Sequence, residues 1–204
     1  MEAISGPFEI DWSKERSCKR VNKMLTKKYN AEVHSQSAIE GSLELKDENG
    51  FLAADIERVE IDIFDVAYHI IGGGEEGDKI IVRSKEEEDH SLQCMLAVAS
   101  LDDQLMPQQY QTERITREDV QTLLRKVIVR ESPEYSRRFP EEHPCKIAIS
   151  LKGGPTFTKE KQEYEGFHTK PMRWETVEGK FERLAGALLV WCTQREHSGN
   201  CCPT

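Results

Sequence analysis

The side chains best suited to chemistry are concentrated between residues 27 and 36. This stretch reads Lys-Lys-Tyr-Asn-Ala-Glu-Val-His-Ser-Gln and directly precedes a predicted helix. An anion at that helix start would meet free backbone N–H groups, the positive end of the helix dipole and the lysine ammonium groups. His34 could then transfer a proton. The alternative, which spacing alone favours, is an exposed polar linker followed by a helix cap.

A second polar group, Asp89–Cys94, also lies at a predicted helix start. An imidazole at His90 beside a hydroxyl at Ser91 suggests nucleophilic catalysis. Adjacent residues rarely point at each other, however, and the sequence identifies no partner that would orient them. Capping of the helix by Asp89 or Ser91 is the favoured interpretation.

A third group lies in Gly166–Met172, a loop between a predicted strand and the last predicted helix. His168 and Lys170 could reach a pocket from this loop. The alternative is that both side chains face solvent.

Other common sites lack support in the sequence. The six cysteines are irregularly spaced, with no CxxC pair and no histidine at zinc-finger distance, so we expect no metal site. Gly72-Gly73-Gly74 has neither the preceding buried strand nor the spacing of a phosphate-binding loop. We interpret these glycines as a flexible connector.

The elements that must position these residues are marked by hydrophobic periodicity. Strict alternation over residues 58–63 predicts a strand with Val59, Ile61 and Ile63 facing a core. Further strands are predicted at residues 79–83 and 127–129, and a hairpin turning at Gly153-Gly154-Pro155 joins two more.

Helices are predicted between these strands. They cover residues 13–25, 35–45, 65–71, 90–101 and 174–191, and another begins after Thr116 in a capping box with Asp119. Strands with one solvent-exposed face, intermixed with helices along the chain, predict an α+β two-layer sandwich. In it, helices cover a small mixed or antiparallel sheet, and a C-terminal helix follows.

Composition narrows the classes of partner. The chain has 204 residues, is 37% hydrophobic and 32% charged, and carries a formal net charge of -9. An acidic surface repels phosphate backbones, so we expect no nucleic-acid partner. No stretch approaches the roughly 18 apolar residues of a membrane helix, and no signal peptide is evident, so we expect a cytoplasmic protein without a membrane partner.

Several of these segments together resemble the MmgE/PrpD family. The resemblance is strongest over residues 28–41 and covers nearly the whole chain to about Ala187. It rests on ordered, correctly spaced motifs: residues 28–41, Asp89–Leu92 with Ala97-Val98-Ala99, Pro107–Tyr110, Arg138-Phe139-Pro140, Gly166–Met172, Trp174-Glu175 and Lys180-Phe181.

The resemblance implies a domain organisation. Members pair a large helical domain with a smaller α+β lid, and many are homodimers. Residues 1–26 would then be a remnant of an upstream helical domain, and residues 27–165 the lid. Residues 166–192 would form a loop and C-terminal helix, and residues 193–204 a flexible tail.

The resemblance also implies a chemistry: proton abstraction next to a carboxylate, without a metal or cofactor. Lys27 matches the lysine that the lid contributes, with Lys28 as the alternative if the alignment slips by one residue. Lys27 and His34 are therefore the predicted catalytic residues. The predicted substrate-binding residues are Lys28, Ser35, Gln36, His90, Ser91 and Lys170. Many members have a tyrosine where this chain has Cys94, which weakens a prediction of native dehydratase chemistry.

Two functions follow as hypotheses. The first is the C-terminal part of a 2-methylcitrate dehydratase-type hydro-lyase that acts on a small tricarboxylate. A separately encoded helical domain would complete it, and a homo-oligomer is expected. The second is a non-catalytic interaction module, or a truncated relic of the family, in which the apolar stripe of the last helix is exposed.

Overall fold

The computed structural model describes residues 24–74 and 79–197, with side chains described as far as residue 186. The predicted helix at residues 13–25 therefore lies almost entirely outside the described residues. None of the helices in this part of the chain combines the length and the hydropathy of a membrane-spanning segment.

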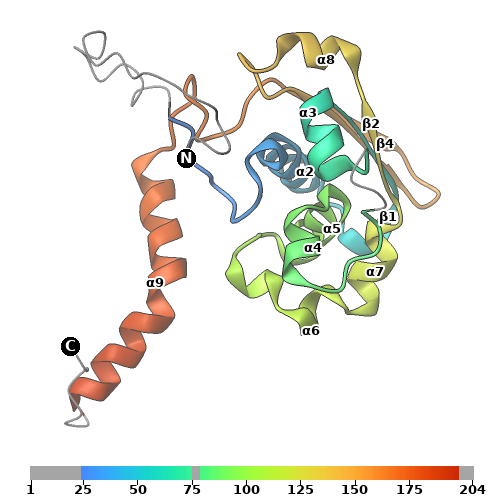
Figure 1. Cartoon of the computed structure of the whole chain (residues 1–204). Coiled ribbons are helices and arrows are strands. Elements are labelled where there is room, and N and C mark those ends of the chain that lie inside the picture. Colours follow the sequence, from blue (N-terminus) through green and yellow to red (C-terminus); the bar gives the residue numbers. More distant parts are fainter. Residues whose placement is uncertain (1–23, 75–78, 198–204) are drawn as a thin grey trace, which may run out of the picture.

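A mixed sheet of four strands organises the described part of the chain (Figure 1). Its order is β2-β1-β3-β4, with β1 parallel to β2 and the other neighbours antiparallel. The strands are β1 (Ile56–Ile63), β2 (Val127–Glu131), β3 (Cys145–Leu151) and β4 (Thr156–Lys161). The α+β class and the mixed sheet predicted from the sequence are both confirmed.

The alternation of apolar and charged side chains along a strand determines which face of the sheet contacts the core. In β1, Val59, Ile61 and Ile63 are buried as predicted, whereas Arg58 is exposed. Ile56 is also buried, because the pairing with β3 shifts register between Ile56 and Arg58. The core side chains of β1 and β3 therefore lie on one face of the sheet.

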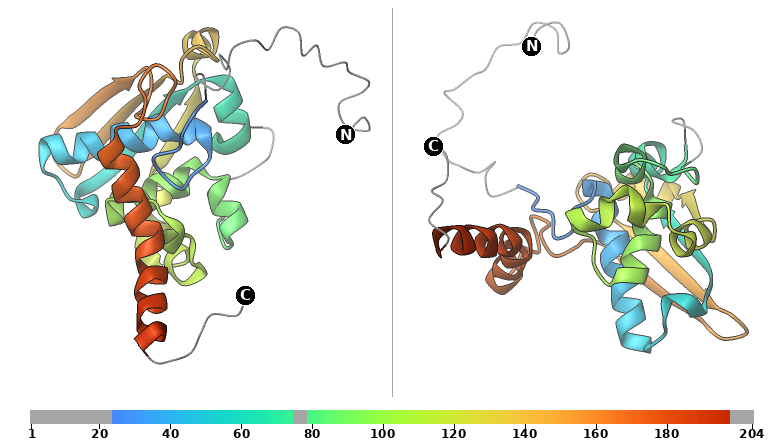
Figure 2. Two further views of the ribbon diagram at one scale, coloured as in Figure 1. Left: turned by 90° about the vertical axis from the view of Figure 1, so that its left-hand side faces the viewer. Right: turned by 90° about the horizontal axis from the view of Figure 1, so that it is seen from below.

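The long helices α2 (Gln36–Asn49) and α5 (Leu92–Asp102) supply the second layer. α2 packs against β3, β4 and α5, and α5 packs against α2, α7 and β2 (Figure 2). α2 approaches the sheet closely at Gly41, where a Cβ atom would collide with the side chain of Ile147. The helix continues past the predicted end at residue 45 and ends where Gly50 takes a left-handed conformation with φ 66°.

Shorter helices connect these layers. After β1 come α3 (Asp65–Ala67) and the π-helical turn η5 (Tyr68–Gly72). The remaining short elements are η3 (Val33–Ser35), η4 (Ala53–Asp55), α4 (Lys85–Asp89), η6 (Pro107–Tyr110), α6 (Thr112–Ile115), α7 (Glu118–Leu124) and α8 (Pro133–Arg138).

Two local predictions are wrong. Residues 79–83 form a turn and an irregular segment rather than a strand: Ile80 and Ile81 are exposed, and only Val82 enters the core. Thr116 does not cap a helix. Its hydroxyl donates back to the carbonyl of Thr112 in the preceding α6, and Arg117 occupies the N-cap position of α7.

The last helix, α9 (Trp174–His197), extends away from the sheet and its covering helices (Figures 1 and 2). Its first turns meet the rest of the chain through polar contacts. Thr176 donates to Glu165, and Lys180 Nζ donates to the carbonyl of Lys27 at 2.5 Å. The predicted helix is confirmed and continues to His197.

Candidate functional site

An open cavity of about 350 Å³ lies beside η3. It contains three imidazoles, from His34, His143 and His168, among mainly apolar walls. The other lining residues are Leu25, Val33, Phe139, Pro140, Glu141 and Phe167. Small-molecule sites commonly combine apolar walls with a few convergent polar groups, so this cavity is the candidate site.

His34 is positioned by Glu32, the N-cap residue of η3. The backbone N–H of His34 donates to Glu32 Oε2 at 2.7 Å, and His34 Nδ1 lies 2.7 Å from Glu32 Oε1. The second contact is close enough for an ion pair with a protonated ring, although its angle is not that of a hydrogen bond. A carboxylate therefore lies directly beside the His34 ring.

His143 was not singled out from the sequence. Its ring stacks on His34, with centroids 5.5 Å apart and an interplanar angle of 26°. Burial, together with the neighbouring His34, lowers the pKa of His143 to about 4. His143 is thus a neutral imidazole near physiological pH. No local pattern could have found it, because it reaches the cavity only when β3 pairs within the sheet.

Lys27 is exposed and lies outside the lining of the His34 cavity. Among the described residues that line the His34 cavity, Leu25 is present and Lys27 is not. Lys27 instead belongs to a cationic group at the base of α9, where burial and the charges of Lys27 and Arg183 lower the pKa of Lys180. The two predicted catalytic residues, Lys27 and His34, therefore lie in neighbouring segments but do not line the same cavity.

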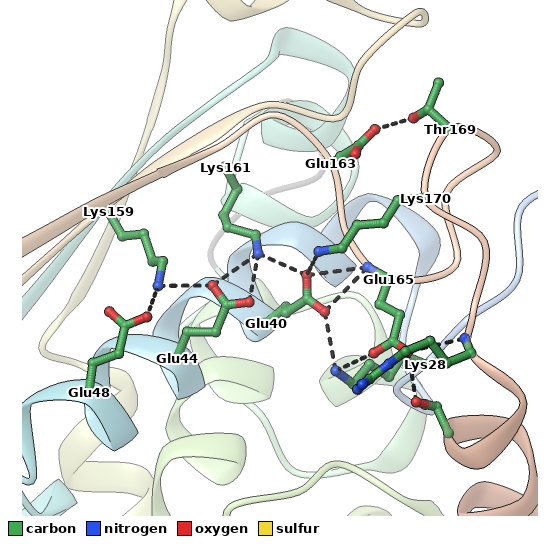
Figure 3. A network of polar contacts seen from close by, with 12 residues as sticks. Lys28, Glu40, Glu44, Glu48, Lys159, Lys161, Glu163, Glu165, Thr169 and Lys170 are labelled. Carbon is green, nitrogen blue, oxygen red and sulfur yellow. Dashed lines mark hydrogen bonds and ion pairs between the residues drawn. The ribbon is translucent and has the colours of Figure 1, made fainter.

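The predicted substrate-binding residues Lys28 and Lys170 both face the buried carboxylate of Glu40 (Figure 3). The Lys28 ammonium lies 3.2 Å from Glu40 and 3.0 Å from Glu165. The Lys170 ammonium lies 3.6 Å from Glu40 and remains half-exposed. Both charges are thus at least partly neutralised within the protein.

The same network continues along α2. Lys161 of β4 lies 2.9 Å from Glu40 and 2.8 Å from Glu44, and Lys159 pairs with Glu44 and Glu48 (Figure 3). Burial would raise the pKa of Glu40, but the hydrogen bond and charge of Lys161 and the charges of Lys28 and Lys170 lower it overall. The network therefore holds Glu40 ionised.

Glu165 forms the other end of the network. Its carboxylate accepts hydrogen bonds from Thr176 at 2.7 Å and from the backbone N–H of Arg173 at 3.2 Å. Burial alone would raise its pKa, yet these bonds and the Lys28 ammonium lower it to about 2. Glu165 therefore joins the start of α9 to Lys28.

Ser35 and Gln36, predicted to bind substrate, are buried and hydrogen-bonded within their own segment. The Ser35 hydroxyl donates to the carbonyl of Glu32 at 2.7 Å. The Gln36 side chain accepts from the backbone N–H of Tyr29 at 3.0 Å and donates to the carbonyls of Tyr29, Ala31 and Glu32. These bonds fix the loop that carries Glu32 and His34.

His90 and Ser91 lie at the junction of α4 and α5. Ser91 caps α5, since its hydroxyl accepts from the backbone N–H of Cys94 and donates to the carbonyl of Lys79 at 2.6 Å. His90 is exposed, with Nδ1 3.1 Å from the carbonyl of Glu86. Within the described part of the chain, neither residue lines the His34 cavity, and no group of three or more suitable side chains could hold a metal ion.

Comparison with known proteins decides the family. The family model for the MmgE/PrpD C-terminal domain matches the sequence over residues 29–198, which is most of the chain. The chain belongs to the MmgE/PrpD family. The resemblance predicted from residues 28–41 and the later motifs is thereby confirmed.

Two relatives of this MmgE/PrpD chain illustrate the extent of the match. It is 30% identical over 139 residues to a cis-aconitate decarboxylase of Mus musculus, covering 68% of the chain and 27% of that protein. It is 29% identical over 147 residues to a 2-methylcitrate dehydratase of Salmonella typhimurium, covering 69% of the chain and 29% of the relative. The match thus spans less than a third of each of these relatives.

The buried network makes the first prediction. Replacing Glu40 by Gln leaves Lys161 and Lys28 without their shared counter-charge, so we expect the free energy of unfolding to fall by about 3 kcal/mol. The matched change Glu48→Gln removes an exposed partner of Lys159 and should cost less than about 1 kcal/mol. Urea unfolding followed by circular dichroism measures both. Equal losses in the two variants would contradict the network's role.

Proposed function

We propose that this chain is the C-terminal part of a 2-methylcitrate dehydratase-type hydro-lyase that acts on a small tricarboxylate. Its family membership supports this proposal, as do relatives named for cis-aconitate and 2-methylcitrate. The observation that carries it is the contact between Glu32 and His34 beside an open cavity. We further propose that a helical unit completes the site.

In the proposed reaction, His34 accepts the proton from the carbon next to a substrate carboxylate. The electrons of that C–H bond form the carbon–carbon double bond as the neighbouring C–O bond breaks. The hydroxyl group leaves as water once it has received a proton from an acid, which we assign to the helical unit. Glu32, 2.7 Å from His34 Nδ1, stabilises the imidazolium that forms.

Substrate carboxylates would be held by the cationic group at the base of α9. Lys27 is exposed, and Lys180 and Arg183 are close enough for their charges to interact. Lysine suits this role because its ammonium group binds carboxylates strongly from several directions. Crowding of like charges in the free protein would be relieved when an anion binds, which favours a polycarboxylate.

The proposal predicts separate effects of two substitutions. With 2-methylcitrate as the probe, nuclear magnetic resonance titration should show Lys27→Ala weakening binding at least about tenfold, equivalent to about 1.4 kcal/mol. His34→Gln should change binding much less, but should abolish dehydration when the chain is mixed with a separately produced helical portion of a relative. Lys152→Ala, which removes an exposed lysine of the β3–β4 turn, is the control. A mixture of the unmodified chain and helical portion that neither binds nor dehydrates 2-methylcitrate would overturn the proposal.

An exposed apolar stripe favours a second candidate function, that of an interaction module. On α9, Trp174 is 69% exposed, Phe181 62% and Leu184 39%, and Val177 lies on the same stripe. The helix stands clear of the sheet and its covering helices (Figure 2). Contiguous apolar side chains of this kind typically mark a protein interface, so we propose that α9 mediates assembly, with a homo-oligomer as one form.

Assembly through α9 predicts a change in mass. Light scattering after size exclusion should give a mass above that of one chain for the unmodified protein. The double change Phe181→Glu and Leu184→Glu should give a monomer, because ionised side chains on the stripe oppose its burial. Glu182→Gln, which lies between them and leaves the stripe intact, serves as the control. A monomeric unmodified chain that binds no hydrophobic dye would exclude this interface.

A further inference from the structure

The short helix α4 carries a buried carboxyl group that the proposed function does not use. Glu88 is fully buried, and both of its carboxylate oxygens lack a hydrogen-bond partner in the described part of the chain. The buried hydroxyl of Tyr110 lies beside Asp89 without the geometry of a hydrogen bond. Native proteins rarely leave such groups unsatisfied, so this arrangement is unfavourable for an ionised Glu88.

The groups facing Glu88 do not supply a free counter-charge. Asp89 lies on α4 itself, Cys94 and Asp102 belong to α5, and Tyr110 and Arg114 belong to η6 and α6. Arg114 is the cation in this set. It is already engaged by two hydrogen bonds to Asp102, at 2.5 and 3.0 Å, and one to Asp119 at 3.2 Å. The surrounding charge is therefore mostly negative.

These surroundings favour the neutral acid. Burial raises the pKa of Glu88 to about 8, the charges of Asp89 and Asp102 act in the same direction, and Arg114 opposes them. An uncharged carboxyl group fits the dry contact between α4 and α5, whereas a carboxylate would require water. Ionisation of Glu88 and closure of α4 are therefore mutually opposed.

The attachment of α4 makes local opening feasible. Its capping box joins Ser84 to Glu87, so these bonds stay within the segment when it moves. The junction with α5 is held by the Ser91 hydroxyl on Lys79 and by the Ser91 N–H on the carbonyl of Glu88. A helix of five residues has little stability of its own, so its position depends on the packing of Glu88.

We propose that α4 is a pH-sensitive flap, closed on α5 and α6 while Glu88 carries its proton and released when Glu88 gives that proton to solvent. Release would move His90 with the helix and uncover Cys94 and Tyr110. The proposal is independent of the dehydratase assignment, because it concerns only the packing of described residues.

The direction of the pH dependence follows from linkage. The closed state holds a Glu88 proton more tightly than the open state, in which the pKa is near the ordinary value of 4.5. Closure is therefore fully favoured below about pH 4.5 and is progressively weakened as the pH rises toward about 8.

Amide hydrogen exchange of α4 and the first turn of α5, corrected for intrinsic exchange rates, tests this flap. The opening equilibrium constant should rise by about tenfold per pH unit between about pH 5 and about pH 8 and then level off. Glu88→Gln should make it independent of pH over that range, because the amide keeps the shape and cannot ionise. Glu86→Gln, an exposed change on the same helix, should behave like the unmodified chain.

A second measurement protects the test against a variant that fails to fold. Carbon nuclear magnetic resonance of the Glu88 carboxyl in the unmodified chain should give a titration midpoint near 8. A midpoint near the ordinary value of 4.5, or a pH-independent opening equilibrium in the unmodified chain, would overturn the proposal.

Discussion

The buried carboxylate of Glu40 is the constraint on which the candidate site depends. Only 3% of its side chain is exposed, yet it is held ionised by Lys161, Lys28 and Lys170. A buried charge is strongly unfavourable without partners. Because those three lysines come from β4, the segment before η3 and the loop before α9, pairing with Glu40 brings these distant segments together.

This pairing positions the site more than it stabilises the fold. Desolvation offsets much of the attraction in a buried ion pair, and apolar packing of α2 and α5 on the sheet supplies most of the driving force for folding. The directional contacts instead fix where Lys28 lies. Since the Gln36 side chain bonds the Tyr29 and Glu32 backbones, the position of Lys28 is transmitted to His34.

The sequence allowed most of the sheet to be predicted, because alternation in β1 reports directly which side chains are buried. The strand predicted at residues 79–83 is wrong because an apolar run forms a strand only where a neighbouring strand accepts its hydrogen bonds. The capping box predicted at Thr116 is wrong because the Thr116 hydroxyl donates instead to the carbonyl of Thr112 in the preceding turn.

The candidate site was less predictable than the fold. His34 could be found because it shares a short segment with other reactive groups, whereas His143 meets it only through the sheet. Sequence could not reveal that Lys170 faces Glu40, since these two residues are far apart in the chain. The roles of Lys27 in binding and of His34 in catalysis remain predictions.

A double-mutant cycle between Lys28 and Glu165 tests most directly whether the network joins the site to the start of α9. The substitutions are Lys28→Met and Glu165→Gln, and the free energies of unfolding of the four proteins are compared. A direct charged contact at 3.0 Å predicts a coupling of at least about 1 kcal/mol. Effects that add within about 0.5 kcal/mol would contradict the account, because the two residues would then act independently.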